Sequence, residues 1–511
     1  MDKSPAKIFS AEIEGVDAAL VEVEVDVGVG LSSFTIVGLA EKAVAEAKER
    51  VSSALKNSGI KPPHRENRRI TVNLAPADTK KQGSFHDLAI ALAYLCASEQ
   101  IRPFDSSRSL FVGELALDGR IRGVRGILNI CAMAAQKGFS EIFIPYQNIK
   151  EASLIDSISV FGVKSLADIL GHLEGTRSLE LIPPSSFESI PFSYDVDFSE
   201  IIGHAGAKRA LAIAAAGGHN VLMMGPPGSG KTMLARSLVS ILPTPTRQEV
   251  LEITQIHSAA GLLLGRPFIP TRPFRAPHHS ASLAAVVGGG QKPRPGEASL
   301  AHRGVLFLDE IPEFHRDVLE SLRQPIESGS IVVARLRAHI EFPARFMLIA
   351  AANPCPCGFW RDSVRACTCS AHDVARYQKK LSGPLLDRID IQLWVDRIEA
   401  KQLRQEPNEG ESALLRNAVD GARRAQRDRF SKHSFLVTCN GELSSTQVRE
   451  CIGISSNSQQ FLERALDGGQ LSARGYFRVL RIARTIADLD GLEQVSDDCV
   501  REAFSYRIRR V

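Results

Sequence analysis

The sequence predicts an α/β protein with more than one domain. Three observations indicate this class. Strand-like and helix-like runs alternate through residues 1–170, a strand, a glycine-rich turn and a helix follow one another at residues 220–242, and two more buried-type strands lie within residues 304–353. The chain has 511 residues, of which 44% are apolar and 23% charged, so it is long enough for two to four globular domains.

The first segment, residues 1–170, is expected to be an α/β or α+β domain. Its strand-like runs include ALVEVEVDVG and RITVNLAP, and its helix-like runs include EKAVAEAKERVSSAL and DLAIALAYLCA. Residues 171–198 are rich in proline and serine and have no sustained period, so we predict a linker there. The next domain, residues 199–395, begins with the helix-like run FSEIIGHAGAKRALAIAAAGGHN, and a helix-rich domain, residues 396–511, ends the chain.

The stretch NVLMMGPPGSGKT, residues 220–232, has the form of a phosphate-binding loop. A short apolar run enters a glycine-rich turn, and KTMLARSLVSIL continues it with the apolar spacing of a helix. Glycines let the backbone curl until successive N–H groups point at phosphate oxygens, with the positive end of the helix behind them. Lys231 would reach the β- and γ-phosphates, and Thr232 would hold Mg²⁺. The residues expected to bind the nucleotide are Gly225, Pro226, Pro227, Gly228, Ser229, Gly230, Lys231 and Thr232.

Two later strands are expected to place polar groups beside this loop. GVLFLDE ends in Asp309, which can assist the coordination of Mg²⁺, and Glu310, which can polarise the attacking water. ARFMLIAAANP carries Asn353 at its end, and that amide could orient the water against the γ-phosphate. Together with the phosphate loop, these residues indicate an ATPase that uses ATP and Mg²⁺.

This order of motifs resembles the AAA+ superfamily of ATPases. The resemblance implies that Arg388, in GPLLDRIDI, projects into the site of a neighbouring subunit as an arginine finger, which implies a ring. An ion pair between Arg388 and Asp387 or Asp390 is the structural alternative. LSARGYFRVLRIARTIADL resembles the helical lid of these ATPases, with Arg474 at the second-sensor position and Arg478 as the alternative.

Two stretches of the first segment, KKQGSFHDLAIALAYL and GELALDGRIRGVRGILNICAMAAQKGFSEIFIPYQN, resemble the proteolytic domain of the Lon protease family, with its ribosomal S5-type fold. In that alignment Phe85 stands at the position of the serine nucleophile and Leu128 at the position of the lysine base. Neither side chain can supply a Ser–Lys dyad, and the adjacent Ser84 would need a register shift. We therefore predict a protease-like scaffold without protease chemistry, used for assembly or substrate contact.

Longer motifs point to a narrower family. FRAPHHSASLAAVVGGG, PRPGEASLAHRGVLFLDEIPEF, the pair NPCPCG and CTCS, and LSGPLLDRID together resemble the magnesium-chelatase-like AAA+ family of the YifB/ComM type, over essentially the whole chain. The resemblance implies a hexameric, ATP-driven helicase that promotes branch migration when single-stranded DNA is integrated during natural transformation. Its partners would be single-stranded and branched DNA and further copies of itself. The alternative is a chelatase-type ATPase that remodels a protein partner.

A ring that moves along DNA needs basic loops in its channel, because it contacts the strand mostly by neutralising phosphates. The net charge of +4 is too small to indicate DNA by itself, so such a site must be local. One candidate is the insertion RPFRAPHHSASLAAVVGGGQKPRPG, and the other is a predicted hairpin in SGSIVVARLRAHIEFP, whose arginines could also form an ordinary solvated face. The candidate DNA contacts are Arg272, Arg275, Lys292, Arg294, Arg335 and Arg337.

Four of the nine cysteines lie close together in the sequence. Cys355, Cys357, Cys367 and Cys369 form two Cys-x-Cys pairs, which could enclose a tetrahedral Zn²⁺ ion. Reduced thiols without a metal are the alternative. Since Asn353 stands two residues before Cys355, a metal there would couple the strand that carries Asn353 to whatever the cysteine loop touches.

The start of the chain, MDKSPAKIFSAEIEG, lacks the apolar segment of a signal peptide, and no apolar run is as long as a membrane span. We therefore expect a cytoplasmic protein without membrane partners, in which cysteines are reduced unless a metal holds them.

Overall fold

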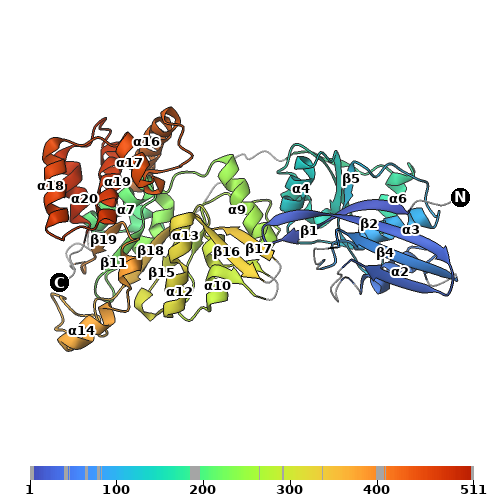
Figure 1. Ribbon diagram of the computed structural model, residues 1–511, viewed down its shortest axis with the longest axis horizontal. Coiled ribbons are helices and arrows are strands. Elements are labelled where there is room, and N and C mark those ends of the chain that lie inside the picture. The colour runs from blue at the N-terminus through green and yellow to red at the C-terminus, as the bar shows by residue number, and fades with distance from the viewer. Residues whose placement is uncertain are drawn as a thin grey trace.

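The computed structural model describes residues 5–38, 44, 46–63, 67–77, 81, 83–184, 196–263, 265–290, 293–335, 338–398, 408 and 410–507. Figure 1 shows three parts in a row: a sheet with helices formed by the N-terminal residues, a second sheet with helices in the middle, and a group of helices formed by the C-terminal residues. The prediction of an α/β protein is confirmed. Among the described residues, no helix is long and apolar enough to cross a membrane.

The N-terminal part is built on a mixed eight-stranded sheet in the order β10-β9-β8-β5-β1-β2-β4-β3. Its strands are β1 (Ala6–Glu14), β2 (Asp17–Val29), β3 (Ser33–Val37), β4 (Arg68–Ala75), β5 (Ser109–Phe111), β8 (Glu141–Pro145), β9 (Ser159–Val163) and β10 (Leu181–Ile182). Strand β2 alternates between the two faces of the sheet and buries Val21, Val23 and Val25 on one of them. This alternation is the period that the run ALVEVEVDVG predicts.

Helices cover this sheet and bury two apolar clusters against it. They are α2 (Ala47–Asn57), α3 (Asp87–Ala97), α4 (Ile127–Gln136), α5 (Ile149–Ala152) and α6 (Leu166–Leu173), and a small hairpin, β6 (Glu114–Leu115) with β7 (Ile121–Arg122), lies beside them. Phe85 is buried in the cluster that also holds α4. Ser84, the alternative nucleophile, donates a hydrogen bond to the carboxylate of Glu114.

The central part contains a five-stranded sheet in the order β12-β15-β18-β11-β19, in which all neighbours are parallel. The strands are β11 (Val221–Met224), β12 (Phe274–Arg275), β15 (Val305–Leu308), β18 (Met347–Ala352) and β19 (Ile391–Trp394). Both faces are apolar: Met223 packs in one cluster and Leu222 in the other. A continuous apolar run such as VLMM is what a parallel strand covered on both sides requires.

Helices and short turns surround this sheet. They include α7 (Ala205–Gly217), α8 (Lys231–Ser237), α9 (Arg247–Ala260), α10 (Leu283–Val287), α11 (Glu297–Leu300), α12 (Arg316–Ser321), α13 (Arg323–Ser328), α14 (Ala371–Gln378) and α15 (Gly383–Leu386). Within the insertion, β13 (Gly288–Gly289) pairs with β14 (Arg294–Pro295). The hairpin predicted before the Asn353 strand is confirmed as β16 (Ser330–Arg335) paired with β17 (Ala338–Pro343).

The C-terminal helices are α16 (Glu411–Lys432), α17 (Ser445–Cys451), α18 (Ser456–Asp467), α19 (Ala473–Leu489) and α20 (Asp497–Ser505). Each of the last four begins at a serine whose hydroxyl accepts an N–H of the first turn, which satisfies an otherwise unpaired helix donor: Ser444, Ser455, Ser472 and Ser496. The buried faces of α16 and α19 share one apolar cluster with α7 and the central sheet. This shared core places α19 against the sheet domain.

Helix α9 joins the central part to the N-terminal part (Figure 1). The N–H of Gly126 donates to the carbonyl of Ser258 at 3.0 Å, and the hydroxyl of Ser258 donates to Glu151 at 2.8 Å. Beside these bonds, Leu128 is fully buried in a cluster with Leu154, Val250 and Phe268. The residue aligned with the lysine base of a Lon protease therefore packs between the two parts of the chain.

Candidate nucleotide-binding site

The phosphate loop connects β11 to α8 and depends on its glycines. Gly228 and Gly230 have φ values of 76° and 82°, in the left-handed region that other L-residues rarely adopt. A Cβ atom at Gly225 would collide with the carbonyl oxygen of Val395. The sequence GPPGSGKT is thus fitted to a tight turn that ends on the first turn of a helix.

Lys231 is buried inside this turn. Its ammonium group donates to the carbonyl oxygens of Gly225 and Pro226, both at 2.8 Å, and lies 3.5 Å from the amide oxygen of Asn353. Burial lowers the pKa of Lys231 to about 8, against the opposing effect of the carboxylates of Asp309 and then Glu310. The ammonium group therefore lies where phosphate oxygens would compete with backbone carbonyls for it.

The predicted polar residues follow the ends of their strands and lie at the same edge of the sheet as the phosphate loop. The hydroxyl of Thr232 donates to Asp309 at 2.8 Å, and Asn353 stands directly after β18. Glu310 has a φ of 51°, and its exposed carboxylate lies 3.9 Å from Nδ1 of His279. Because the carboxyl ends of parallel strands meet at one edge, the structure brings Lys231 together with these residues, although they are distant in sequence.

A large cavity lies at the opposite edge of this sheet. Its volume is about 670 Å³, and its walls include Asn220, Gly304, Met347 and Asp390, which stand at or just before the amino ends of four strands. A four-residue strand spans about 13 Å, so this cavity is well separated from the phosphate loop. The arginines that line it are Arg272, Arg303, Arg345, Arg388, Arg423, Arg474, Arg478 and Arg481.

Arg388 and Arg474 both line this cavity, so neither lies beside the phosphate loop at the other edge of the same sheet. Arg388 is buried; it donates to the carbonyl of Pro384 at 2.7 Å and pairs with Glu327 at 2.6 Å, while its Nε has no hydrogen-bond partner among the described residues. Arg388 is therefore held by Glu327 and Pro384, and not by the alternative ion pairs with Asp387 or Asp390. Arg474 is exposed in the cavity wall.

Arg478, and not Arg388, contacts Asp390, which the sequence had offered as an ion-pair partner for Arg388. Its Nε lies 3.5 Å from Asp390, which also accepts the N–H of Asn220 at 3.0 Å. Burial would raise the pKa of Asp390, but His219 and Arg478 hold it below its usual range. Arg478 is thus tied to the sheet, which distinguishes it from Arg474 on the same helix.

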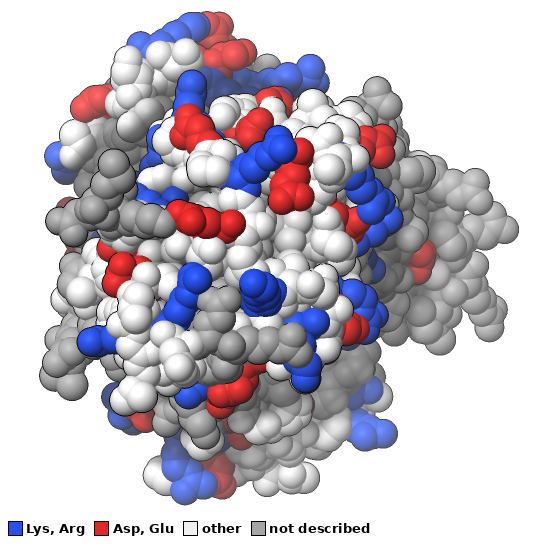
Figure 2. Space-filling model, turned by 90° about the vertical axis from the view of Figure 1, so that its right-hand side faces the viewer, with Lys and Arg blue, Asp and Glu red and all other residues white. Residues whose placement is uncertain are grey.

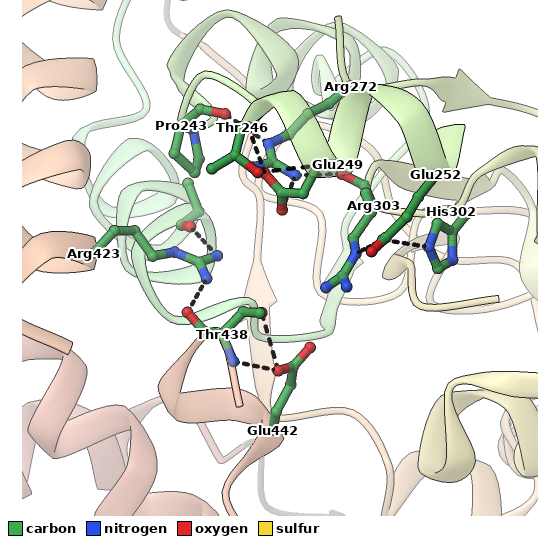
Figure 3. A network of polar contacts seen from close by, with 11 residues as sticks. Pro243, Thr246, Glu249, Glu252, Arg272, His302, Arg303, Arg423, Thr438 and Glu442 are labelled. Carbon is green, nitrogen blue, oxygen red and sulfur yellow. Dashed lines mark hydrogen bonds and ion pairs between the residues drawn. The ribbon is translucent and has the colours of Figure 1, made fainter. Parts of the chain in front are cut away.

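Figure 3 shows a second group of fixed arginines at this cavity. Both outer nitrogens of Arg272 bind Glu249, and its Nε donates to the carbonyl of Pro243 at 2.6 Å. Arg303 pairs with Glu252 at 2.8 Å, and the hydrogen bond from His302, together with Arg303, lowers the pKa of Glu252 to about 2. Arg272 is therefore buried, and its guanidinium is bonded within the chain; its role as a DNA contact stays a prediction.

The other candidate DNA contacts differ in their exposure. Arg275 is half-buried in an ion pair with Glu297, with two contacts of 2.6 and 2.7 Å, whereas Arg294 is exposed on β14. Lys292, Arg337 and the side chain of Arg335 lie outside what the structure describes. On the end of the molecule seen in Figure 2, Lys and Arg side chains are interspersed with Asp and Glu.

The four cysteines converge on one point, with all four sulfur atoms within 4.8 Å of one another. The Sγ atoms of Cys355, Cys357 and Cys367 are 3.4 to 3.7 Å apart. Thiolates around a tetrahedral Zn²⁺ with Zn–S bonds of 2.3 Å lie about 3.8 Å apart, and a disulfide needs about 2.0 Å. The sulfur atoms therefore have the spacing of thiolates around one zinc ion, and the cluster fits such a ligand set.

The fold and this arrangement define a P-loop nucleotide-binding protein of the AAA+ type. Family models described as magnesium chelatase subunit ChlI match residues 197–403 and 23–148, and the model of its C-terminal part matches residues 409–507. The chain therefore belongs to the magnesium-chelatase-like family of which ComM and YifB are members.

Two similar proteins match nearly the whole chain, and a third matches part of it. The competence protein ComM of Haemophilus influenzae is 44% identical over 508 residues, 99% of this chain and 97% of that protein. The protein YifB of Escherichia coli is 42% identical over 494 residues, 96% of this chain and 95% of that protein. The magnesium-chelatase 38 kDa subunit of Acidiphilium rubrum is 28% identical over 342 residues, 61% of this chain and 91% of that protein.

The cavity was not predicted from the sequence, although the spacing of three of its arginines indicates that they share one helix face. Arg474, Arg478 and Arg481 are spaced by four and three residues, which puts them on one face of α19. The contact of His279 with Glu310 had no such signal, because a loop residue far along the chain makes it.

Proposed function

We propose that this protein hydrolyses ATP and uses the energy to move DNA strands as a ring, promoting branch migration when single-stranded DNA is integrated during natural transformation. The observation that carries the ATPase is the convergence of Lys231, Thr232, Asp309, Glu310 and Asn353 at one sheet edge. The DNA substrate is supported by the name of a relative, competence protein ComM, that matches nearly the whole chain.

The chemistry follows from what each group can do. Lys231 would exchange its bonds to the loop carbonyls for bonds to phosphate oxygens, and Thr232 with Asp309 would hold Mg²⁺. That ion, when bound, neutralises charge on the phosphates. Glu310 would accept a proton from the attacking water, and Asn353 would orient that water. The exposed carboxylate of Glu310 is reachable by solvent, as this role requires.

The basic cavity supports the proposal of a ring, with six subunits as the expected number. Arg388 stands across the sheet from its own phosphate loop, so it is better placed to meet the nucleotide of a neighbouring copy. Its unpartnered Nε, and the exposed guanidinium of Arg474, suit an anionic ligand that enters the cavity. We propose Arg388 as the finger that acts on the neighbour's ATP and Arg474 as the second sensor.

We propose four functional units along the chain: a Lon-like scaffold at 1–170, a linker at 171–198, the AAA+ core at 199–395 and the helical lid at 396–511. The start of that linker packs with the scaffold, because α6 ends at Leu173 and β10 pairs with β9. The scaffold would have no protease chemistry, because Phe85 and Leu128 are both buried in apolar clusters. The cysteine cluster would hold a structural Zn²⁺. The candidate DNA contacts are Arg272, Arg275, Lys292, Arg294, Arg335 and Arg337, of which Arg272 would have to give up bonds within the chain, and the proposed location is the cytoplasm.

A second candidate is an ATPase that remodels a protein partner, as the name magnesium-chelatase subunit suggests for its relatives. The chelatase family models match the chain in three segments, which favours this alternative. It requires the same ATP site but no DNA contact, so a test of DNA dependence separates the two.

The deciding experiment is steady-state ATP hydrolysis with and without single-stranded and branched DNA. We expect DNA to raise the rate at least about fivefold in the native protein, and Glu310→Gln to bind ATP but turn it over about 100-fold more slowly. Native-like hydrolysis by Glu310→Gln would contradict the site. ATPase activity that no DNA stimulates would favour the protein-remodelling alternative.

A further inference from the structure

The cysteine loop, residues 355–369, lies directly on the phosphate loop. Gly358 has a φ of 83°, and a Cβ atom there would lie 2.6 Å from Cγ and 2.7 Å from Cδ of Pro227. Pro227 is one of the residues that form the turn around the phosphates. The backbone of the cysteine loop therefore packs so closely on this turn that no side chain fits between them.

The same loop also contacts the segment on the other side of the phosphate loop. The rings of Trp360 and Trp394 meet edge to face, with centroids 6.4 Å apart, and Asp362 pairs with Arg397 at 2.9 Å. Trp394 ends β19, and the next carbonyl, that of Val395, is the one that touches Gly225. The cysteine loop thus braces the phosphate loop both at Pro227 and through the end of β19.

Secondary structure does not hold the cysteine loop in this position, because residues 355–369 contain neither a helix nor a strand. Of its apolar side chains only Cys355 is fully buried; Phe359 and Trp360 are partly buried, and Val364 is 72% exposed. What the loop does have is the sulfur cluster, whose spacing fits metal-bridged thiolates and not disulfides. In addition, the N–H of Trp360 donates to Sγ of Cys355 at 3.3 Å, an arrangement typical of a metal-bound thiolate.

We propose that a Zn²⁺ ion bound by Cys355, Cys357, Cys367 and Cys369 holds Gly358 against Pro227 and thereby keeps the phosphate loop in the shape that binds ATP. Metal occupancy then sets nucleotide affinity. This inference rests on the ATP site and the zinc site proposed above, and it assigns the metal a task in nucleotide binding. It also gives a reason for the short spacing between Asn353 and the cluster. Asn353 lies beside Lys231, and Gly358, five residues later, packs on Pro227 of the same phosphate loop.

The first test compares the full-length protein with and without its metal. Zinc per chain is measured by elemental analysis, and affinity is measured by titration with a fluorescent ATP analogue in excess Mg²⁺. We expect one zinc ion per chain. Removing it with a chelator should weaken ATP binding at least about fivefold, and adding Zn²⁺ back should restore it. Cys367→Ser should behave like the stripped protein, and Cys96→Ser, a cysteine of α3, like the native protein.

The second test leaves the metal in place and disturbs only the contact. Gly358→Ala adds one methyl group that must displace Pro227, so we expect normal zinc content and ATP binding weakened at least about fivefold. Gly138→Ala is the matched control, because Gly138 has a similar φ of 81° with open space around it. This pair separates the contact from the general strain of a side chain in the left-handed region.

Each outcome decides a different claim. A native protein that neither contains nor takes up zinc would overturn the metal site and with it this inference. Zinc present, with ATP affinity within about twofold of native after stripping and in Gly358→Ala, would overturn the coupling but leave the metal site standing. Native-like ATP binding by Lys231→Ala would instead show that the proposed ATP site itself is wrong.

Discussion

The hydroxyl of Thr232 donates a hydrogen bond of 2.8 Å to Asp309, across 77 residues of sequence. Thr232 is the second residue of α8 and Asp309 follows β15, and β18 lies between the strands that lead to them. A hydroxyl and a carboxylate in contact at a phosphate loop can supply two of the six oxygen ligands of an octahedral Mg²⁺ ion, and water and phosphate oxygens can supply the rest. The contact therefore marks where the metal and the γ-phosphate would meet.

Thr232→Ala should raise the Mg²⁺ concentration needed for half-maximal ATP hydrolysis at least about tenfold, because the metal loses one oxygen ligand. Thr232→Ser keeps that oxygen and should stay within about threefold of native. The measurement is ATPase rate against Mg²⁺ concentration at fixed ATP. Equal Mg²⁺ dependence in the alanine and serine variants would contradict the assignment of Thr232.

ATP affinity should fall as pH rises above about 8. Lys231 has a pKa of about 8 because burial disfavours its charged form, so near neutral pH most molecules carry the charge that phosphate binding uses. Above that pH the neutral form dominates, and binding must first add a proton. We expect a loss of roughly fivefold to tenfold between pH 7.5 and pH 9, measured by titration with a fluorescent ATP analogue.

Lys231→Arg is the control for this pH dependence, since a guanidinium stays charged throughout the range. Its affinity should be lower than native but should change less than about twofold with pH. A native protein whose affinity is as flat as that of the arginine variant would place the titrating group elsewhere.

The packing of Leu128 should hold the N-terminal part onto α9. Leu128→Ala removes a fully buried side chain from a cluster with Val250 and Phe268, and such truncations cost about 2–5 kcal/mol. We expect chemical denaturation to show that loss and limited proteolysis to release the N-terminal part more readily. Leu414→Ala, at a site that is 71% exposed, should change neither. Unchanged stability in Leu128→Ala would mean that this cluster does not join the two parts.

Arg272 and Arg294 should respond differently to mutation. Arg272→Ala leaves Glu249 buried without its partner, so we expect the free energy of unfolding to fall by about 3 kcal/mol. Arg294→Ala removes an exposed charge and should leave stability unchanged while reducing the salt dependence of DNA binding by about one phosphate contact. The two measurements are urea denaturation and DNA binding at several salt concentrations. Unaltered DNA binding in Arg294→Ala would remove that residue from the DNA contacts.

The carboxyl edge of the central sheet could be predicted from the sequence because each of its parts is a short contiguous motif. NVLMMGPPGSGKT, FLDE and AANP each contain a strand end and polar residues that follow it, and parallel pairing then brings them together. The basic cavity could not be predicted in this way, because its walls come from segments between Gly218 and Arg481. The ion pair of Arg272 could not be predicted for the same reason: its partner, Glu249, lies on another element, and the insertion by itself gives no sign of the pairing.

Arg388 should act on the nucleotide of a neighbouring copy, and mixing two inactive variants tests this directly. Arg388→Ala has an intact phosphate loop but no finger, and Lys231→Ala has the finger but a defective loop. Each alone should hydrolyse ATP at less than about 5% of the native rate. In mixed rings some Arg388→Ala loops meet a Lys231→Ala neighbour that supplies the guanidinium. Random assembly of equal amounts makes about one interface in four competent, so activity should recover to at most about a quarter of native.

The control mixes Lys231→Ala with Glu310→Gln, two defects of the same site, and should recover nothing. If the Arg388→Ala mixture also recovers nothing although the subunits exchange, Arg388 serves its own chain, and its pairing with Glu327 is structural.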